Sequence, residues 1–170
     1  MPEKEIRDVF VVGLRNAHAM ENQALSIMKP QLKRIDNYPE VAAKLDQHIR
    51  ETEGQINRLE EILDGLNEDK SMLKDLALSF TGSMAALGHT VAGDEILKNA
   101  FANFAFEHYE AAAYKSLLAV AEAGGYGAAM TGLQANLAEE LAMAEWINDN
   151  LAALTKKFLS LREAGETAKV

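Results

Sequence analysis

Two glutamates stand one helical turn apart among aromatic residues in the segment NFAFEHYEAAAY, residues 103–114. They are Glu107 and Glu110, and a helical period places Glu107 on the same apolar face as Phe104 and Tyr114, with Glu110 at its edge. A carboxylate in such a place is costly to bury unless it is protonated, paired or bound to a metal ion. The segment therefore raises the question of what neutralises these two groups.

The other long helical segments place a carboxylate or a histidine against their apolar faces in the same way. At about 100° per residue, Glu21 falls within the apolar stripe of the first segment, and Glu140 falls at the centre of the stripe of the last one. In the second segment, His48 lies inside the stripe and Glu51 lies at its edge. Each predicted helix thus offers at least one such group to the interior or to its border.

Counter-charges for these groups are scarce. The apolar stripes contain no lysine or arginine, and Arg58 and Lys115, the nearest residues of that kind, have side chains long enough to reach the surface. Two divalent cations would balance the carboxylates, and an oxygen-rich site of this kind favours iron or manganese. The predicted metal ligands are Glu21, His48, Glu51, Glu107, Glu110 and Glu140.

Each of these residues also has a simpler interpretation. A single histidine such as His48 is more often a hydrogen-bonded core residue than a ligand, and an edge glutamate such as Glu51 is usually solvated. Glu139 and Glu140 are adjacent, so one of the two could lie at the surface of a wide helix face. The occurrence of such groups on all four predicted helices favours a metal site over a set of coincidences.

The elements that must carry these residues are helices, because the chain has only three prolines and no strand-like alternation. We predict long helices over residues 3–35, 39–66, from the cap Asp94 to 123, and 128–164, with a shorter helix over 70–89. Pro30 is expected to kink the first helix or to end its regular part, and GGYG to stop the third long helix. Residues 1–166 form one predicted domain, and residues 167–170 a frayed tail.

The connections between the helices indicate the fold. A short turn joins the first two long helices, and another joins the last two, so each pair is antiparallel. The link between the two pairs is about 25 residues long, which allows a crossover that makes the second and third long helices parallel. The prediction is an all-α, ferritin-like antiparallel four-helix bundle with one long crossover carrying a short helix.

Composition excludes several classes of function. The formal net charge is −9 and no long Lys/Arg block is present, so binding to nucleic acid or to an anionic membrane through bulk charge is not expected. The absence of cysteine excludes disulfides, thiolate zinc sites and cysteine nucleophiles. Because the chain shows no signal-peptide pattern and no apolar run long enough to span a bilayer, we expect a cytoplasmic protein.

At these residues the chain resembles the YciF/YciE-type ferritin-like stress proteins of bacteria. The resemblance extends over nearly the whole chain and is most specific in HIRETEGQINRLEEIL (48–63) and FEHYEAAAYKSLLAVAEAGGY (106–126). Further support comes from DVFVVGLRNAHAMENQAL in the first helix and LQANLAEELAMAEWI (133–147) in the last. The resemblance implies a ferritin-like bundle, a homodimer, a dinuclear metal motif at the positions named above, and a role in stress responses.

The implied site departs from the usual ferritin-like pattern. A glutamate followed three residues later by a histidine is missing from both expected helices, because Gly54 follows Glu51 and Met143 follows Glu140 at that spacing. Family members also often carry an acidic residue where Ala144 stands. The site is therefore poor in nitrogen ligands.

Two functions follow as hypotheses. In the first, Glu51 and one of the third-helix glutamates bridge two Fe or Mn ions, Glu21 and Glu140 are terminal ligands, and the pair reacts with O2 or peroxide. Gln55 and Tyr114 are expected to hold ligands by hydrogen bonds. In the second, the protein is a non-catalytic, stress-induced interaction protein with a vestigial or incomplete metal site. Cage-forming iron storage is not indicated, because nothing in the sequence specifies a shell.

Overall fold

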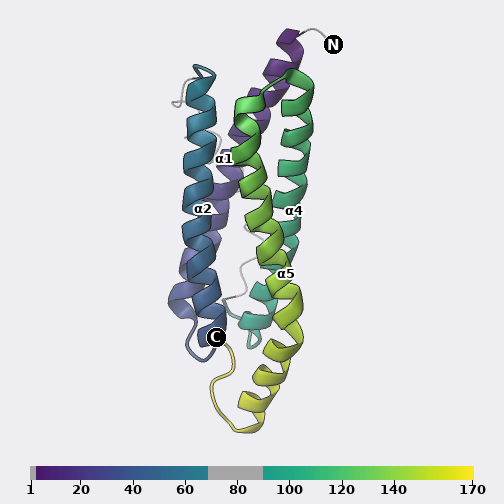
Figure 1. The fold of residues 1–170 in the computed structure, drawn as a ribbon. Coiled ribbons are helices and arrows are strands. Elements are labelled where there is room, and N and C mark those ends of the chain that lie inside the picture. The colour runs from purple at the N-terminus through teal and green to yellow at the C-terminus, as the bar shows by residue number, and fades with distance from the viewer. Residues whose placement is uncertain (1–2, 69–89) are drawn as a thin grey trace.

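Four long helices make up most of the protein. The computed structural model describes residues 3–68 and 90–170, and within them no strand occurs. The helices are α1 (Glu3–Arg34), α2 (Pro39–Gly65), α4 (Glu95–Gly124) and α5 (Gly127–Glu163), shown in Figure 1. The all-α prediction is confirmed, and each long helix begins and ends within a few residues of its predicted bounds. The short helix predicted over 70–89 lies outside the described residues.

Each helix packs between two antiparallel neighbours: α1 contacts α2 and α4, and α5 contacts the same two helices from the other side. At one end of the bundle, Phe10 near the start of α1 stacks on Tyr126 in the α4–α5 turn, with ring centroids 4.5 Å apart. At the other end, the N–H groups of Asn37 and Ile96 donate to the carbonyls of Val170 and Lys169. The starts of α2 and α4 therefore lie at the same end of the bundle, so these two helices are parallel, as the sequence predicted.

Local sequence signals account for several helix ends. Gly125 adopts φ = 73°, a left-handed conformation that favours glycine, and it ends α4 as predicted. Pro30 does not end α1, which continues to Arg34; the proline is exposed, so the backbone carbonyl that loses its partner can be hydrated. Asp94 occupies the N-cap position of α4 without a side-chain cap bond, and its carboxylate pairs with Lys98 at 2.9 Å instead.

The C-terminal residues 167–170 are packed against the bundle, which corrects the prediction of a frayed tail. Ala168 is buried, and its carbonyl accepts a hydrogen bond of 2.6 Å from the hydroxyl of Tyr38. The ammonium of Lys169 lies 3.5 Å from Oε2 of the buried Glu95. The tail therefore joins the α1–α2 turn to the start of α4, through partners that are distant in the sequence.

The core consists of apolar layers above and below a polar one. Leu14, Leu59 and Leu133 are fully buried towards the end of the bundle marked by Tyr126. Leu45 and Met143 are buried towards the opposite end. The layer between them holds the acidic side chains predicted from the sequence. Among the described residues, no helix is long and apolar enough to cross a membrane.

Candidate metal centre

All four helices project an ionisable side chain into the middle of the bundle. Each of these side chains belongs to a residue that exposes 2% or less of its surface: Glu21 from α1, His48 from α2, Glu107 and Glu110 from α4, and Glu140 from α5. The helical period predicted this inward placement, since each residue lies within or beside the apolar stripe of its helix.

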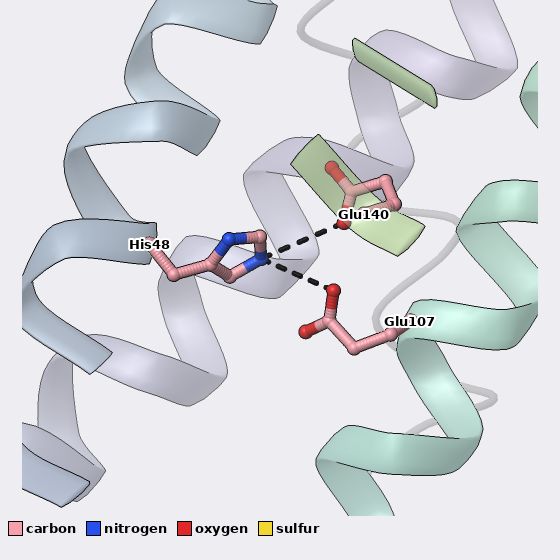
Figure 2. A group of neighbouring side chains, drawn as sticks. All are labelled: His48, Glu107 and Glu140. Atoms are coloured by element: carbon pink, nitrogen blue, oxygen red, sulfur yellow. Dashed lines mark ion pairs between the residues drawn. The ribbon is translucent and has the colours of Figure 1, made fainter. Parts of the chain in front are cut away.

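Three of these residues form a close group, shown in Figure 2. Nε2 of His48 lies 3.1 Å from Oε2 of Glu107 and 3.5 Å from Oε2 of Glu140. One potential ligand atom from each residue lies within 4.8 Å of the other two. Metal–ligand bonds of about 2.0–2.2 Å place two ligands of one ion at most about 4.4 Å apart. The two distances from Nε2 of His48, 3.1 and 3.5 Å, fall within this limit, so the group is about the size that a single ion requires.

Glu51, which the sequence predicted as a bridging ligand, stands outside this group. Its Oε2 lies 3.1 Å from Nδ1 of His48, and its side chain is 25% exposed. Three residues along a helix correspond to a rotation of about 60° from the starting direction, so Glu51 faces the helix border when His48 faces inward. With Nδ1 bonded to Glu51, Nε2 is the imidazole nitrogen presented to Glu107 and Glu140, which is the usual arrangement of a ligating histidine.

Several buried polar atoms in this layer have no hydrogen-bond partner among the described residues. They are both carboxylate oxygens of Glu110, both of Glu140, Oε2 of Glu21, and the side-chain amide atoms of Gln55. Buried polar atoms are nearly always satisfied, because desolvation without a new bond is unfavourable. Metal coordination would satisfy the carboxylate oxygens. Gln55 is fully buried, but its amide holds no ligand by a hydrogen bond here.

Burial and neighbouring charges shift the pKa values of Glu21, His48, Glu107 and Glu110 in this layer. Burial raises the pKa of Glu21 and of Glu110 well above the ordinary glutamate range, and neighbouring carboxylates raise both further. Burial also raises the pKa of Glu107 to about 8, although His48 opposes this. Burial alone would lower the pKa of His48, but its contacts with Glu107 and Glu140 raise that pKa to about 11. Without a metal ion, protons must supply the missing positive charge.

The charge of the layer matches that of two divalent cations. Glu21, Glu107, Glu110 and Glu140 together carry −4 when all four ionise, and His48 is neutral when Nε2 ligates a metal ion. Among the described residues, no lysine or arginine side chain is buried, so none neutralises these groups from within the core. Two divalent ions supply +4. The donor set, rich in oxygen with one imidazole, fits the iron or manganese predicted from the sequence.

Tyr114 connects this layer to a chain of hydrogen bonds that reaches the surface. Its hydroxyl donates to Oε1 of Glu21 and accepts a 3.0 Å bond from Nδ2 of Asn136. Nη1 of Arg58 donates to Oδ1 of Asn136 at 2.7 Å. Arg58 also makes two bonds of 2.8 Å to Glu139. Arg58 therefore pairs with this half-buried glutamate and does not neutralise the buried carboxylates directly.

Comparison with known proteins identifies the family of the chain. Residues 5–160 match the family described as Domain of unknown function, DUF892. The chain belongs to the DUF892 family. Protein YciF of Escherichia coli strain K12 is 29% identical to this DUF892 protein over 150 residues, which cover 84% of this chain and 87% of that protein. The YciF-type resemblance seen in the sequence is thereby confirmed.

Solved structures show the same fold. A protein from Xanthomonas campestris pv. campestris superimposes on this DUF892 protein with a TM-score of 0.77 and 28% identity, covering 94% of this chain and 99% of that one. The crystal structure of the E. coli stress protein YciF gives a TM-score of 0.73 at 24% identity, covering 86% and 94% respectively. The latter likeness supports the fold alone.

One residue of this DUF892 site was not predicted from the sequence. Asn136 is fully buried and bonds to Tyr114, Arg58 and, at 3.4 Å, the backbone carbonyl of Gln55. The available signal was its spacing: Asn136 stands four residues before Glu140, on the same face of α5 as Leu133. A buried amide at this position needs hydrogen-bond partners, as the inward glutamates do.

Proposed function

We propose that this DUF892 protein binds two divalent iron or manganese ions at the centre of its bundle and reacts with O2 or peroxide. The observation that carries the proposal is the buried layer itself, in which Glu107 and Glu140 contact His48, Glu21 and Glu110 are buried beside them, and no lysine or arginine among the described residues is buried. The unpartnered carboxylate oxygens and the raised pKa values are physical signs of a site arranged around positive charge.

The residues have distinct roles in this proposal. His48, Glu107 and Glu140 hold one ion, since their ligand atoms already lie together. Glu110 and Glu21 complete the site for a second ion, and the pKa of Glu110 is raised by the charges of Glu21, Glu140 and Glu107 beside it. Glu51 fixes the orientation of His48, and Tyr114 leaves only Oε2 of Glu21 free for coordination.

When bound in the reduced form, a metal pair would supply two electrons, with which one hydrogen peroxide and two protons become two waters. The apolar layers on either side of the site, which include Leu59, Leu133 and Met143, exclude bulk water. Exclusion of water strengthens the electrostatic interactions among the ligands and limits release of partly reduced oxidant. The hydroxyl of Tyr114, held between Glu21 and Asn136, keeps the Glu21 carboxylate in one orientation.

Metal content tests the proposal directly. Protein purified without chelator should contain about two Fe or Mn ions per chain by mass spectrometry, as four carboxylates and one imidazole suggest. The variant Glu107→Ala/Glu140→Ala should lose them. The matched control Glu122→Ala/Glu145→Ala changes two exposed glutamates on the same two helices and should retain them. Wild-type protein that remains metal-free after anaerobic incubation with ferrous or manganous salt would contradict the proposal.

A second candidate function is a non-catalytic interaction protein. The observation that favours it is a groove of about 340 Å³ between α1 and α4, whose lining includes the half-exposed Val9 and Tyr109 and the small residues Gly13 and Ser116. A second copy of the chain is the expected occupant, in keeping with the homodimer implied by the family resemblance. Sedimentation of wild type and of Val9→Glu measures the oligomeric state. A wild-type dimer that becomes a monomer in Val9→Glu supports this interface, and a wild-type monomer contradicts it.

A further inference from the structure

A separate cavity lies along the bundle axis directly beside the candidate metal layer. It has a volume of about 40 Å³, and all four helices line it. Three of its lining residues, Leu45, Asn103 and Met143, stand three or four positions from His48, Glu107 and Glu140 in their own helices. Because a helix rises 1.5 Å per residue, these lining residues lie roughly 4.5–6 Å along the bundle axis from the residues of the metal layer. The cavity lies towards the end of the bundle that holds Tyr38.

The lining of this cavity is uncharged. Its polar members are four side-chain amides, and the remaining lining residues are aliphatic or aromatic apart from the thioether of Met143. These amides belong to Gln31, Asn99, Asn103 and Asn150. A charged molecule that enters such a space loses its hydration without gaining a counter-charge, whereas a small neutral molecule does not carry this penalty. The cavity is therefore suited to an uncharged species that can form hydrogen bonds.

The cavity has an outer and an inner side. Trp146, Asn150 and Leu154 are half-buried and form the side nearer to solvent, whereas Leu45 and Met143 are buried on the inner side. A cavity needs about 10–15 Å³ to hold one water molecule. The observed volume therefore accommodates a few molecules of that size.

A smaller cleft lies beside this cavity and reaches the acidic layer at Glu107. It has a volume of about 10 Å³, lies between α1 and α4, and is lined by Glu107 together with Met28 and Phe106. Gln31 and Asn103 line both spaces. Their amides bond reciprocally, with Nδ2 of Asn103 donating to Oε1 of Gln31 at 2.9 Å and Nε2 of Gln31 donating to Oδ1 of Asn103 at 3.4 Å. This amide pair is the partition between the cavity and the cleft that touches Glu107.

We propose that the cavity is the route by which hydrogen peroxide reaches the metal layer, and that the Gln31–Asn103 amide pair is its gate. The inference rests on the proposed function, because it names the oxidant and its path to the same site. Hydrogen peroxide is uncharged, is about the size of two waters, and both donates and accepts hydrogen bonds. It can therefore replace each bond of the amide pair as the two side chains part, a movement that passage requires because the cleft of about 10 Å³ holds no more than one water. Neutral amide bonds are weaker than charge-assisted ones, so the pair opens more readily than an ion pair would.

Two variants that fill the route test the proposal. Asn103→Leu removes the gate and occupies its space, and Ala100→Phe fills the cavity from a half-buried position on α4. Asn148→Leu is the matched control, because Asn148 is exposed on α5 and does not line the cavity. Each protein is loaded anaerobically with ferrous iron, its metal content is measured, and it is mixed with hydrogen peroxide in a stopped-flow spectrometer. We expect oxidation to be at least about tenfold slower in either filled variant, and unchanged in the control.

A charged oxidant separates the route from damage to the site. Ferricyanide is a large anion that cannot enter the uncharged cavity, so its rate with the loaded protein should be the same in wild type and filled variants. If Asn103→Leu and Ala100→Phe bind the same amount of metal and react with peroxide as fast as wild type, the route is overturned. Equal slowing with ferricyanide also overturns it, because the substitutions would then act on the site itself.

A measurement without metal tests the same path. Trp146 is the single tryptophan of the chain and lines the cavity. Quenching of its fluorescence by dissolved oxygen, a small neutral probe, should decrease at least twofold in Ala100→Phe, while quenching by iodide should not change. Equal oxygen quenching in both proteins overturns the route. A wild-type protein that binds no metal overturns the proposed function, whereas metal-loaded filled variants with unchanged peroxide rates overturn only the route.

Discussion

The hydroxyl of Tyr114, on α4, donates a hydrogen bond to Oε1 of Glu21, on α1, and both side chains are fully buried. This bond joins two helices at the level of the acidic layer and leaves Oε2 of Glu21 without a partner. A carboxylate fixed by one oxygen presents the other in a defined direction. The relationship therefore positions a ligand, and its removal should affect both metal binding and stability.

Tyr114→Phe should weaken metal binding and destabilise the metal-free protein. Loss of a partner that orients a ligand typically lowers metal affinity by about 10–100-fold. A buried acceptor left unpaired costs about 1–3 kcal/mol of unfolding free energy. Urea denaturation with chelator and competitive metal titration measure the two effects. Tyr126→Phe, in the α4–α5 turn at one end of the bundle, is the control and should change neither value appreciably, because its ring stacking on Phe10 is kept. Equal effects in both variants would contradict a specific role for the hydroxyl of Tyr114.

Glu110→Gln should stabilise the metal-free protein at pH 8 and reduce its metal content. Burial and the nearby charges of Glu21, Glu140 and Glu107 raise the pKa of Glu110, so ionising this group opposes folding. Glutamine keeps the shape without the charge. We expect a gain on the order of 1 kcal/mol, which corresponds to about 2–4 °C in Tm for a chain of this size. Calorimetry with chelator measures it, and Glu122→Gln, at an exposed position, should leave Tm unchanged. A lower Tm in Glu110→Gln would argue against carboxylate repulsion in the layer.

The metal-free protein should lose stability as pH rises through neutrality. Burial raises the pKa values of Glu21, Glu110 and Glu107 above the unfolded value near 4.5, that of Glu107 to about 8. A group with a raised folded-state pKa contributes stability that is fully present below the unfolded pKa and is lost as pH rises through the folded pKa. The pKa of His48 is raised to about 11, so its protonation in the folded protein also contributes stability that decreases as pH rises above 6.5. Thermal unfolding with chelator from pH 5.5 to 8.5 should therefore show a falling Tm.

Metal should reverse this dependence, because ligands bind in their deprotonated form and affinity rises with pH. The same pH series with excess manganous salt should show a smaller fall in Tm, or a rise. A metal-free protein whose Tm rises from pH 5.5 to 8.5 would contradict the arrangement of raised pKa values. Identical curves with and without manganese would indicate that the layer does not bind this ion.

Glu51→Gln should weaken metal binding without abolishing it. Glu51 contacts Nδ1 of His48 and lies at the helix border, so it orients the imidazole and does not coordinate through the core. Removing such a contact is expected to reduce affinity by about 10–100-fold, whereas His48→Ala should remove a ligand and lower metal content. Glu61→Gln, at an exposed position on α2, is the control. If Glu51→Gln loses as much metal as His48→Ala, Glu51 is itself a metal ligand and not only a residue that orients His48.

The inward direction of most acidic residues could be predicted because helical periodicity is a local property. Glu21, Glu107 and Glu140 lie within the apolar stripes of their own helices, and those stripes are read from residues within a few turns. Once the helices pack, the same faces must turn towards one another. The antiparallel pairs could be predicted from the turn lengths, because a short connection makes two consecutive helices pack side by side in opposite directions.

Other features depended on contacts that no local pattern contains. The period of α2 placed His48 inside the apolar stripe and Glu51 at its edge, but only the packing of α2 against its neighbours decided that Glu51 contacts Nδ1 of His48 and stays outside the group formed by His48, Glu107 and Glu140. The bonds of Asn136 to Tyr114 and Arg58 join three helices. The tail is anchored by residues that lie far away in the sequence, including Tyr38.

The sequence by itself thus determined the four long helices and the inward direction of most of the carboxylates in the acidic layer. Only the tertiary structure decided which of them meet, which imidazole nitrogen they meet, and where a cavity remains beside them. The physical reason is that a helix face is set by neighbouring residues, whereas the rotation, height and spacing of four helices are set jointly by side chains that pack from all of them. The candidate metal centre depends on both levels, because its charges come from the helix faces and its geometry comes from the packing.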